Sequence, residues 1–472
     1  MTTTTATMPG YVTDVAYSAT FTPALAPDWL DLVALIAGFA PPARRDDFAF
    51  CELACGRGLT SAVLAATHPD ATFHAIDFME QHIAYAGQLA NRAGIGNLTL
   101  HPTDFAGAAR LALPRFQYIV AHGAYSWIDA EARADLRDFI DRHLADDGLV
   151  YLSYNALPGW LTDMPLQRLI AAFAKRAPGD SLAKFAAAEA ALRHISAAGV
   201  PALQLSPMFA RLLATQRAQL PANYFAHEYL APAWQPLYVT DVRSELASIG
   251  LRPVGSATLA DNFDSFVLRA AQRDALAGIE DADTRELVRD CMLMTEFRCD
   301  VFARHPTRLR ESARRREILR RRFALVRPQP LVAWSMRTKA GTLRFDNPLT
   351  RAIVAALDNG PLALRQLEGP ASDVVANALA LAAAGIIRPV NQRDTPVDAL
   401  NEALAEFDSD ATPLPFRALP CGTALRLEPA LHHCLRGHGR LPRRLRAWPD
   451  FLARAMGATT QDQSRGKRAA AN

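Results

Sequence analysis

Apolar and polar positions in the first third of the chain predict strands and helices in strict alternation. Short, nearly continuous apolar runs are typical of buried strands, and the amphipathic stretches between them have helical spacing. This order predicts an α/β fold with a doubly wound, Rossmann-like parallel sheet. The expected strands are residues 48–53, 72–77, 98–101, 118–122 and 148–154, and the expected helices are residues 59–67, 80–92 and 130–144, the last with Asp129 as its N-cap.

After Trp160 the pattern becomes alanine-rich and helical, which predicts a helical insertion or cap. A helix and a strand then return to the sheet and complete it, and another helical stretch follows. From residue 328 onward the pattern predicts strand, helix, helix and strand, which is typical of a winged-helix-like module. The elements expected in these parts are residues 166–177, 181–198, 207–219, 239–249, 251–258, 283–304, 334–345, 349–357, 372–384 and 386–389.

These patterns divide the chain into consecutive segments. A chain of 472 residues exceeds the size of one hydrophobic core, so about three domains are expected. The predicted segments are an N-terminal lid and helix (1–47), the core (48–175), a helical insertion (176–235), a middle domain (236–325) of which residues 236–270 complete the core sheet, the winged-helix-like domain (326–395), and an irregular, partly disordered tail (396–472).

Composition narrows the class of protein only slightly. Half of the residues are hydrophobic and 21% are charged, as in ordinary globular enzymes, and a net charge of +3 does not by itself indicate nucleic acid. The six cysteines are scattered, which favours reduced thiols in the cytoplasm over a disulfide framework. The N-terminus lacks a basic segment followed by an apolar one, so no signal peptide is expected. No apolar run is long enough to cross a membrane.

The most informative motif is the turn after the first expected strand. There the sequence E-L-A-C-G-R-G places Glu52 at the strand end, followed by Ala54, Gly56 and Gly58. Such a bend has no bulky side chain, so a cofactor can lie directly on backbone amides. Asp77 closes the next strand 21 residues after Gly56 and is placed to bind the two hydroxyls of a ribose.

Details of this turn favour a nucleoside cofactor that carries a positive charge. A dinucleotide site requires G-x-G-x-x-G, but Ser61 stands where the third glycine would be, and Glu52 would repel a pyrophosphate. Glu52 suits a cation instead, such as the amino group of a methionyl moiety reached through water. No phosphate-binding G-x-x-x-x-G-K-[ST] motif is present.

With the A-I-D strand end and the later L-T-L-H-P-T-D-F segment, the turn resembles class I S-adenosylmethionine-dependent methyltransferases. The segments A-H-G-A-Y-S-W-I, L-S-Y-N-A-L-P-G-W, A-H-E-Y-L, Q-P-L-Y-V and E-F-R-C-D-V-F resemble, more narrowly, bacterial protein lysine methyltransferases with a methyltransferase regulatory domain. The resemblance implies S-adenosylmethionine as cofactor, S-adenosylhomocysteine as product, a regulatory domain within 236–325, lysine side chains of a protein as acceptor, and a homodimer.

The resemblance also assigns roles to further residues, each of which has a simpler structural alternative. Phe78 would stack on the adenine or belong to the core, and Asp104 with Phe105 would read the adenine amino group or cap a short helix. For Asp77 the alternative is a helix cap, a role that does not exclude binding of the ribose. His122 is either functional or an ordinary buried histidine, and Tyr17 would form part of a lid over the cofactor.

The acceptor site is predicted from the chemistry of methyl transfer to an amine. A lysine ammonium has a pKa of about 10.4 in water, and apolar walls lower that pKa because they penalise the charged form. Tyr125, Trp127, Tyr154 and Trp160 lie near the ends of the fourth and fifth expected strands, where such a channel would open, although each aromatic ring could equally be a packing residue. Asn155 would orient the amine through its carbonyl oxygen.

Two other groups of residues, one rich in cysteine and histidine and one rich in arginine, are interpreted as having structural roles. Cys421, His432, His433, Cys434 and His438 fit no standard zinc spacing, so no metal site is predicted. The arginine-rich segment 304–327 contains an apolar stripe and is interpreted as a connecting helix, so nucleic acid is not an expected partner. Methylation of a small molecule, and a regulator that binds nucleic acid and senses S-adenosylmethionine without turnover, remain the alternatives to methylation of a protein.

Overall fold

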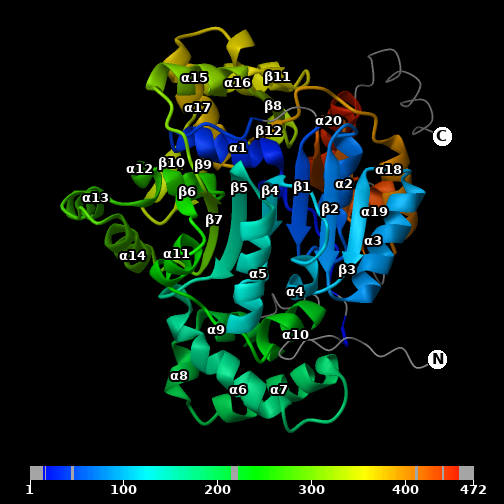
Figure 1. Cartoon of the computed structure of the whole chain (residues 1–472), viewed down its shortest axis with the longest axis vertical. Helices are drawn as coiled ribbons and strands as arrows, with labels where there is room; N and C mark the ends of the chain where they lie inside the picture. Colours follow the sequence, from blue (N-terminus) through cyan, green and yellow to red (C-terminus); the bar gives the residue numbers. More distant parts are fainter. Residues whose placement is uncertain are drawn as a thin grey trace.

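A seven-stranded sheet forms the centre of the protein (Figure 1). The computed structural model describes residues 14–15, 17–43, 47–213, 222–409, 413–437 and 441–456. Strand order is β3-β2-β1-β4-β5-β7-β6, with β1 to β5 parallel and β7 antiparallel to both β5 and β6. The strands are β1 (Ala49–Leu53), β2 (Thr72–Asp77), β3 (Leu98–Pro102), β4 (Phe116–Ala121), β5 (Leu144–Asn155), β6 (Arg252–Ser256) and β7 (Phe297–Ala303).

Burial on both faces explains why the inner strands are apolar throughout. In β4, Tyr118 and Val120 face one hydrophobic cluster, while Ile119 and Ala121 face the other. Parallel strands require this double cover, since their crossover helices lie on both faces. The expected doubly wound α/β sheet is therefore confirmed. The helices that cover it are α1 (Pro27–Ile36), α2 (Leu59–Thr67), α3 (Glu80–Arg92), α4 (Phe105–Ala108), α5 (Ala130–His143) and α11 (Val239–Ala247).

The helical cap lies at the carboxyl ends of the parallel strands (Figure 1). Its own apolar core joins Trp160, Phe185, Phe225 and Tyr229. The cap is therefore a separate layer. The chain leaves the sheet after β5 to form it and returns to the sheet at β6. Its helices are η2 (Gly159–Thr162), α6 (Met164–Ala174), α7 (Ser181–Ser196), α8 (Pro201–Gln204), α9 (Pro207–Leu213) and α10 (Ala222–Leu230). No helix in the described ranges is both long and apolar enough to cross a bilayer.

The prediction of one helix over residues 283–304 is correct only for the first half of that range. The chain forms α14 (Ala282–Leu293), turns at Met294 with a φ of 46°, and then enters strand β7. Buried Arg298 and Asp300 interrupt the apolar pattern of β7, which is why its sequence does not look like an inner strand. Between β6 and α14 lie η4 (Leu259–Asn262), α12 (Asp264–Val267) and α13 (Ala270–Ala277).

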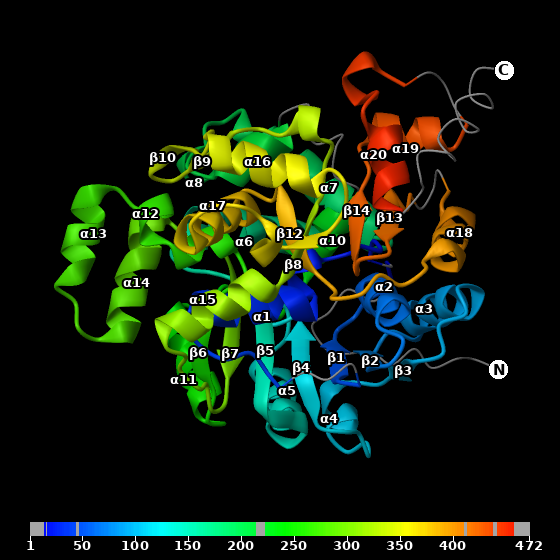
Figure 2. The ribbon, with the colours of Figure 1, turned by 90° about the horizontal axis from the view of Figure 1, so that it is seen from above.

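The C-terminal part begins at the opposite end of the sheet from the cap (Figure 1, Figure 2). Helix α15 and strand β12 contact α1, and Arg321 donates to the buried carboxylate of Asp31, which also accepts from Tyr118 at 2.6 Å. The order β11-β8-β12 makes a three-stranded antiparallel sheet. The elements are α15 (Glu311–Arg320), β8 (Arg322–Leu325), η5 (Gln329–Leu331), β9 (Ser335–Thr338), β10 (Gly341–Arg344), α16 (Pro348–Leu357), β11 (Leu362–Ala363), η6 (Leu364–Gln366), α17 (Ala371–Ala383) and β12 (Ile387–Val390).

Residues beyond 395 are more regular than their proline content suggests. Those that the structure describes form two strands and several short helices, whose apolar side chains join the large core cluster of the sheet. Burial on a neighbouring surface stabilises elements too short to be recognised from local sequence. Residues 457–472 lie outside the described residues. The elements are α18 (Asp398–Phe407), β13 (Phe416–Leu419), β14 (Thr423–Arg426), α19 (Pro429–Leu435), η7 (Arg443–Leu445) and α20 (Trp448–Ala455).

Candidate functional site

A cavity of about 440 Å³ lies between the carboxyl ends of the strands and the helical cap. This is the place where α/β sheets bind their ligands. Most of the side chains singled out from the sequence line it, together with residues from the cap and from the start of β7. The lining residues that the sequence predicted are Tyr17, Ala54, Gly56, Asp77, Phe78, Asp104, Phe105, His122, Trp127, Asn155 and Trp160.

The turn after β1 takes a backbone conformation that suits glycine. Ala54, Gly56 and Gly58 all have positive φ values, of 53°, 53° and 65°. Nothing lies within 4 Å of the position of a Cβ at Gly56, so the missing side chain leaves the wall of the cavity clear for a ligand. Gly58 does not line the cavity. A Cβ at Gly58 would lie 2.8 Å from Cβ of Ala86, so this glycine allows α3 to pack against the turn.

Replacing Gly58 with alanine is therefore expected to destabilise the fold by about 2–5 kcal/mol, through a left-handed backbone penalty of ~1–2 kcal/mol and overpacking of ~1–3 kcal/mol. Gly94→Ala is the matched control, because Gly94 has nearly the same φ, 66°, but nothing within 4 Å of its Cβ position. Thermal unfolding of the two variants separates the backbone penalty, which both share, from the cost of the contact with Ala86, which only Gly58→Ala has. Equal loss of stability in both would show that the contact with Ala86 has no effect.

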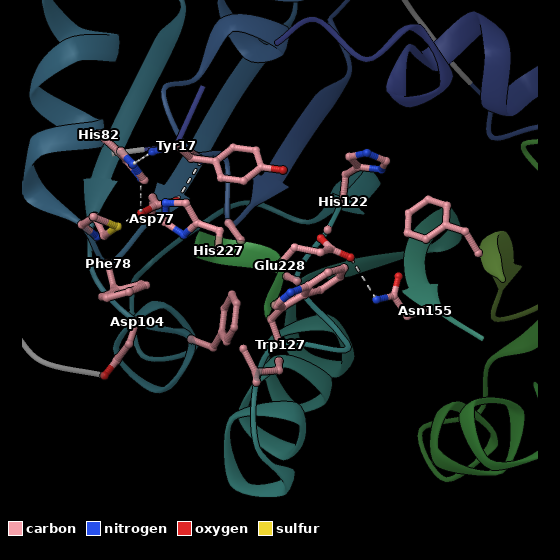
Figure 3. Close-up of a pocket in the computed structure, with 18 of the residues that line it drawn as sticks. Tyr17, Asp77, Phe78, His82, Asp104, His122, Trp127, Asn155, His227 and Glu228 are labelled. Carbon is pink, nitrogen blue, oxygen red and sulfur yellow. Dashed lines mark hydrogen bonds and ion pairs between the residues drawn. The ribbon is translucent and has the colours of Figure 1, made fainter. Parts of the chain in front are cut away.

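Asp77 is held in place at the edge of the cavity. One carboxylate oxygen accepts from the Gly56 amide at 2.8 Å, and the other accepts from the Met79 amide at 2.9 Å and contacts His82 at 3.2 Å. His82 accepts in turn from the Tyr17 amide at 3.2 Å. These contacts fix the carboxylate before any ligand arrives. Figure 3 shows Asp77, His82 and Tyr17 together on one side of the cavity.

Phe78 and Asp104 lie near Asp77 on the same side (Figure 3), and Phe105 also lines the cavity. Asp104 caps α4 by accepting from the Gly107 amide at 2.7 Å, so its structural role as a cap is present. Its side chain also lines the cavity. Capping uses one oxygen, so the carboxylate retains acceptor capacity for a ligand.

Glu52 does not line the cavity. Its carboxylate is buried behind the turn, accepts from the Ser61 amide at 3.1 Å, and accepts a second hydrogen bond from the Ser61 hydroxyl. Glu52 therefore caps the N-terminus of α2. Burial raises the pKa of Glu52 to about 7 despite these hydrogen bonds. The prediction that it meets a cationic ligand receives no support from this position.

Tyr125 and Tyr154, both predicted to line the acceptor channel, are buried away from the cavity. The Tyr125 hydroxyl hydrogen-bonds to Glu245 behind the sheet, and the Tyr154 hydroxyl donates to Asp300 at 2.7 Å. Burial in this environment raises the pKa of Tyr154 well above its usual value. The proposed channel role of these two tyrosines is therefore wrong, and they are core residues with satisfied hydroxyl groups.

The other half of the cavity is aromatic and polar. Trp127 and Trp160 are each 8% exposed, and Trp160 packs edge to face on Trp234. The His122 Nδ1 atom lies 2.8 Å from the Tyr151 hydroxyl, and burial lowers the pKa of His122 to about 4, so its ring is neutral at pH 7. The Asn155 amide side chain lies 3.5 Å from Glu228 of α10.

Several lining residues escaped prediction from the sequence. His82 lies in the helix after Asp77, and His227 and Glu228 come from the cap. Glu296 directly precedes β7, and Phe297 is the first residue of that strand. His227 and Glu228 belong to A-H-E-Y-L, and Glu296 and Phe297 to E-F-R-C-D-V-F. Both segments contributed to the family resemblance, and that was the one sequence signal that pointed to them. Nothing in the sequence of either segment indicated that the two meet at one cavity.

The described N-terminal residues run across this cavity. Asp14 accepts from the amide and hydroxyl of Ser181 at the start of α7, and the Val15 carbonyl lies 2.8 Å from His227 Nε2. The Tyr17 ring then packs edge to face on His227 at 5.1 Å. The segment therefore links the cap to the turn. This placement is compatible with the lid expected from the resemblance.

The two constellations outside the cavity have structural contacts. His432 lies 2.7 Å from Asp408, and Cys421 is buried; His438 lies outside the described residues. In the arginine-rich segment, Arg304 pairs with Asp141 and Arg321 with Asp31, so both arginines tie the connection to the core.

Two family models match this chain. Residues 50–148 match a methyltransferase domain, and residues 221–304 match a predicted methyltransferase regulatory domain. In the structure the second region contains β6 and β7, so it completes the sheet, and it contributes His227, Glu228, Glu296 and Phe297 to the cavity. The two matched regions therefore share one sheet and one site.

Known proteins similar to the chain come from several bacteria. An uncharacterised protein of Synechocystis is 32% identical over 439 residues, which cover 89% of this chain and 87% of that protein. An uncharacterised protein of Rickettsia prowazekii is 27% identical over 28% of this chain and 53% of its own length. The structure of PKMT2 from Rickettsia typhi in complex with AdoHcy has a TM-score of 0.66 at 16% identity, with 93% and 91% of the two chains covered, and so shares the fold.

Proposed function

Because the chain belongs to the S-adenosylmethionine-dependent methyltransferases that carry a methyltransferase regulatory domain, we propose that it transfers methyl groups to lysine amines of a protein substrate. The methyl donor is S-adenosylmethionine. Two features support a protein acceptor: the fold shared with PKMT2, a protein lysine methyltransferase, and the residues that line the cavity away from Asp77, here called its acceptor end.

The residues on the Asp77 side of the cavity fit an adenosyl group. The clear space at Gly56 would admit the cofactor against the backbone, the fixed carboxylate of Asp77 would accept from both ribose hydroxyls, and Asp104 with Phe105 would contact the adenine. When bound, the cofactor supplies a methyl group activated by a neighbouring sulfonium. The protein mainly has to align the acceptor and exclude water, since an in-line displacement needs no covalent nucleophile.

The observation that carries the proposal is the set of residues that line the cavity away from Asp77. Asn155 and the largely buried rings of Trp127 and Trp160 line it, as do Glu296 and Phe297, both exposed at the surface. An aromatic lining that continues to exposed residues suits a long side chain whose parent polypeptide stays outside.

The test is to incubate the purified protein with methyl-labelled S-adenosylmethionine and fractionated bacterial extract. We expect label in polypeptide, and methylated lysine after acid hydrolysis. Label confined to small molecules would establish the metabolite alternative, and no label in any fraction would contradict methyl transfer. Asp77→Ala protein serves as the control for cofactor-dependent labelling.

Three finer statements stay predictions. The helices α16 and α17 with the sheet β11-β8-β12 are compatible with the winged-helix-like module expected from the sequence. The homodimer is tested by light scattering on the purified protein, and the cytoplasmic location by fractionation of cells.

A further inference from the structure

Glu228 is a buried carboxylate at the acceptor end of the cavity. It extends from cap helix α10, is 9% exposed, and lies at 3.5 Å from the Asn155 amide nitrogen. Figure 3 shows it beside the Trp127 ring, on the side of the cavity away from Asp77. Among the described residues, no arginine, lysine or histidine makes an ion pair with it. A carboxylate buried without a cationic partner is costly, and a ligand that brings a cation would remove that cost.

The groups around Glu228 do not compensate its charge at neutral pH. Burial lowers the pKa of both His122 and His227 to about 4, so these rings are neutral. Burial and the proximity of Glu228 raise the pKa of Tyr17 to about 12, so this hydroxyl is also neutral. Glu296 adds a second carboxylate at the exposed end, and Arg211 of α9 lies at the surface side of the lining. The interior of the acceptor end is therefore negative and aromatic.

We propose that Glu228 binds the incoming ammonium of the methyl acceptor and removes one proton from it before methyl transfer. This inference rests on the proposed function, because it assumes that the acceptor is an amine. An N–H bond of R–NH₃⁺ breaks as an O–H bond forms on the Glu228 carboxylate, which leaves R–NH₂ and a neutral carboxylic acid. The nitrogen lone pair then forms the N–CH₃ bond while the S–CH₃ pair stays on sulfur. The product is R–NH₂⁺–CH₃, and the proton on Glu228 passes to solvent.

The neighbouring residues suit this role. The rings of Trp127 and Trp160 bind a cation through their faces, and the exclusion of water by the same rings lowers the pKa of the bound ammonium, because desolvation penalises the charged form. Asn155 contacts Glu228 and lines the same space, so it is placed to orient either the carboxylate or the amine. Glu296 lies at the entrance, where it attracts the ammonium without burial.

A pH dependence follows from the burial of Glu228, which raises its pKa to about 7. The acid form dominates below this pH and cannot accept a proton, so methylation should fall as pH decreases through about 7. In Glu228→Gln this step of the pH profile disappears, and the rate at pH 7 drops by about 10²- to 10⁴-fold, the usual contribution of a positioned base. The variant should recover at pH ~10, where lysine amines lose their proton without help.

The experiment compares wild type with Glu228→Gln, Glu228→Asp and Glu131→Gln. Glu131 is exposed on α5 and does not line the cavity, so it controls for the change from glutamate to glutamine itself. Methylation of poly-L-lysine is followed from pH 6 to 10 with labelled S-adenosylmethionine. Binding of n-butylammonium to each protein loaded with S-adenosylhomocysteine is measured by calorimetry, with n-butanol as the neutral probe. Infrared difference spectra against Glu228→Gln follow the protonation of the carboxyl group directly.

The expected results are a carboxyl titration near pH 7 that only Glu228→Gln lacks, ammonium binding that depends on Glu228, and partial activity in Glu228→Asp. Equal pH profiles and equal ammonium binding in wild type and folded Glu228→Gln would overturn the inference, even if poly-L-lysine is methylated. If wild type binds n-butylammonium through Glu228 but methylates no polypeptide, the assignment of the ammonium site stands and the choice of protein as substrate fails.

Discussion

Replacing Asp77 with alanine is expected to weaken binding of S-adenosylhomocysteine by about 10²- to 10⁴-fold, since two hydrogen bonds from ribose hydroxyls to a charged acceptor are worth ~1.5–3 kcal/mol each. The expectation depends on how firmly the carboxylate is held. The Gly56 and Met79 amides and His82 fix its position in advance, so a ribose binds without paying to order this side chain. Isothermal titration calorimetry with S-adenosylhomocysteine measures the loss.

Asp77 also supports the turn, so the variant needs two controls. Asp70→Ala makes the same change at an exposed residue before the same strand and should leave binding unaltered. Asp77→Asn keeps the shape and one acceptor, and should fall between wild type and Asp77→Ala. Circular dichroism establishes that each variant is folded. Undiminished binding by a folded Asp77→Ala protein would place the ribose elsewhere.

Local sequence signals predicted the residues on the Asp77 side of the cavity well. Helices α2 and α3 begin and end where expected, and the turn between β1 and α2 has the left-handed conformations that glycines allow. The reason is physical: strand, turn and helix lie within some thirty residues, and the residue types needed for each follow one another in order. Asp77 could therefore be placed opposite Gly56 from spacing alone.

The other half of the cavity depends on contacts between distant parts of the chain. Tyr154 lies near the end of β5, as expected, but its hydroxyl meets Asp300, 146 residues away, so it faces the core and not the cavity. Adjacent Asn155 faces the cavity and meets Glu228 of the cap. Successive residues of a strand point to opposite faces, and only the three-dimensional structure identifies which face carries the site. No spacing rule could have found Glu228.

The region that matches the regulatory domain, residues 221–304, is part of the central sheet and not a separate unit. It supplies β6 and β7, and β7 is hydrogen-bonded to β5 along seven residue pairs from Leu149–Ala303 to Asn155–Phe297. Glu296 and Phe297 at the start of β7 thereby reach the cavity. Any change that displaces β7 should alter the acceptor end directly, without a separate domain having to move.

A cluster of buried charges fixes β7 in this position. Arg298 binds both oxygens of Asp300 at 2.8 and 3.1 Å, Asp290 of α14 at 2.7 Å, and Glu286 at 3.0 Å. Although burial disfavours its charge, the surrounding carboxylates raise the pKa of Arg298 well above the usual value. Asp300 also accepts from Tyr154, so the cluster connects α14, β7 and β5 through one guanidinium.

Arg298→Ala is therefore expected to destabilise the protein by about 3–5 kcal/mol, the usual effect of removing one partner of a buried ion pair. Arg285→Ala is the matched control, because Arg285 is 38% exposed and pairs with Asp264 at 2.6 Å near the surface; its loss should cost about 0–1 kcal/mol. Thermal unfolding compares the two variants, and hydrogen exchange of the β7 amides should accelerate only in Arg298→Ala. Equal stability losses would mean that the cluster does not hold the strand.

The loss of folding stability in Arg298→Ala should also depend on pH, and it should become smaller as pH falls. Burial already raises the pKa of Asp290 while Arg298 opposes that rise, so removal of the guanidinium raises it further. An acid whose pKa is higher in the folded than in the unfolded state binds protons preferentially when folded, and so it stabilises the fold as pH falls. The stability difference between wild type and Arg298→Ala should therefore shrink between pH 8 and pH 5. A difference that stays constant over this range would show that the destabilisation comes from lost packing of the arginine side chain and not from carboxylates left without their cation.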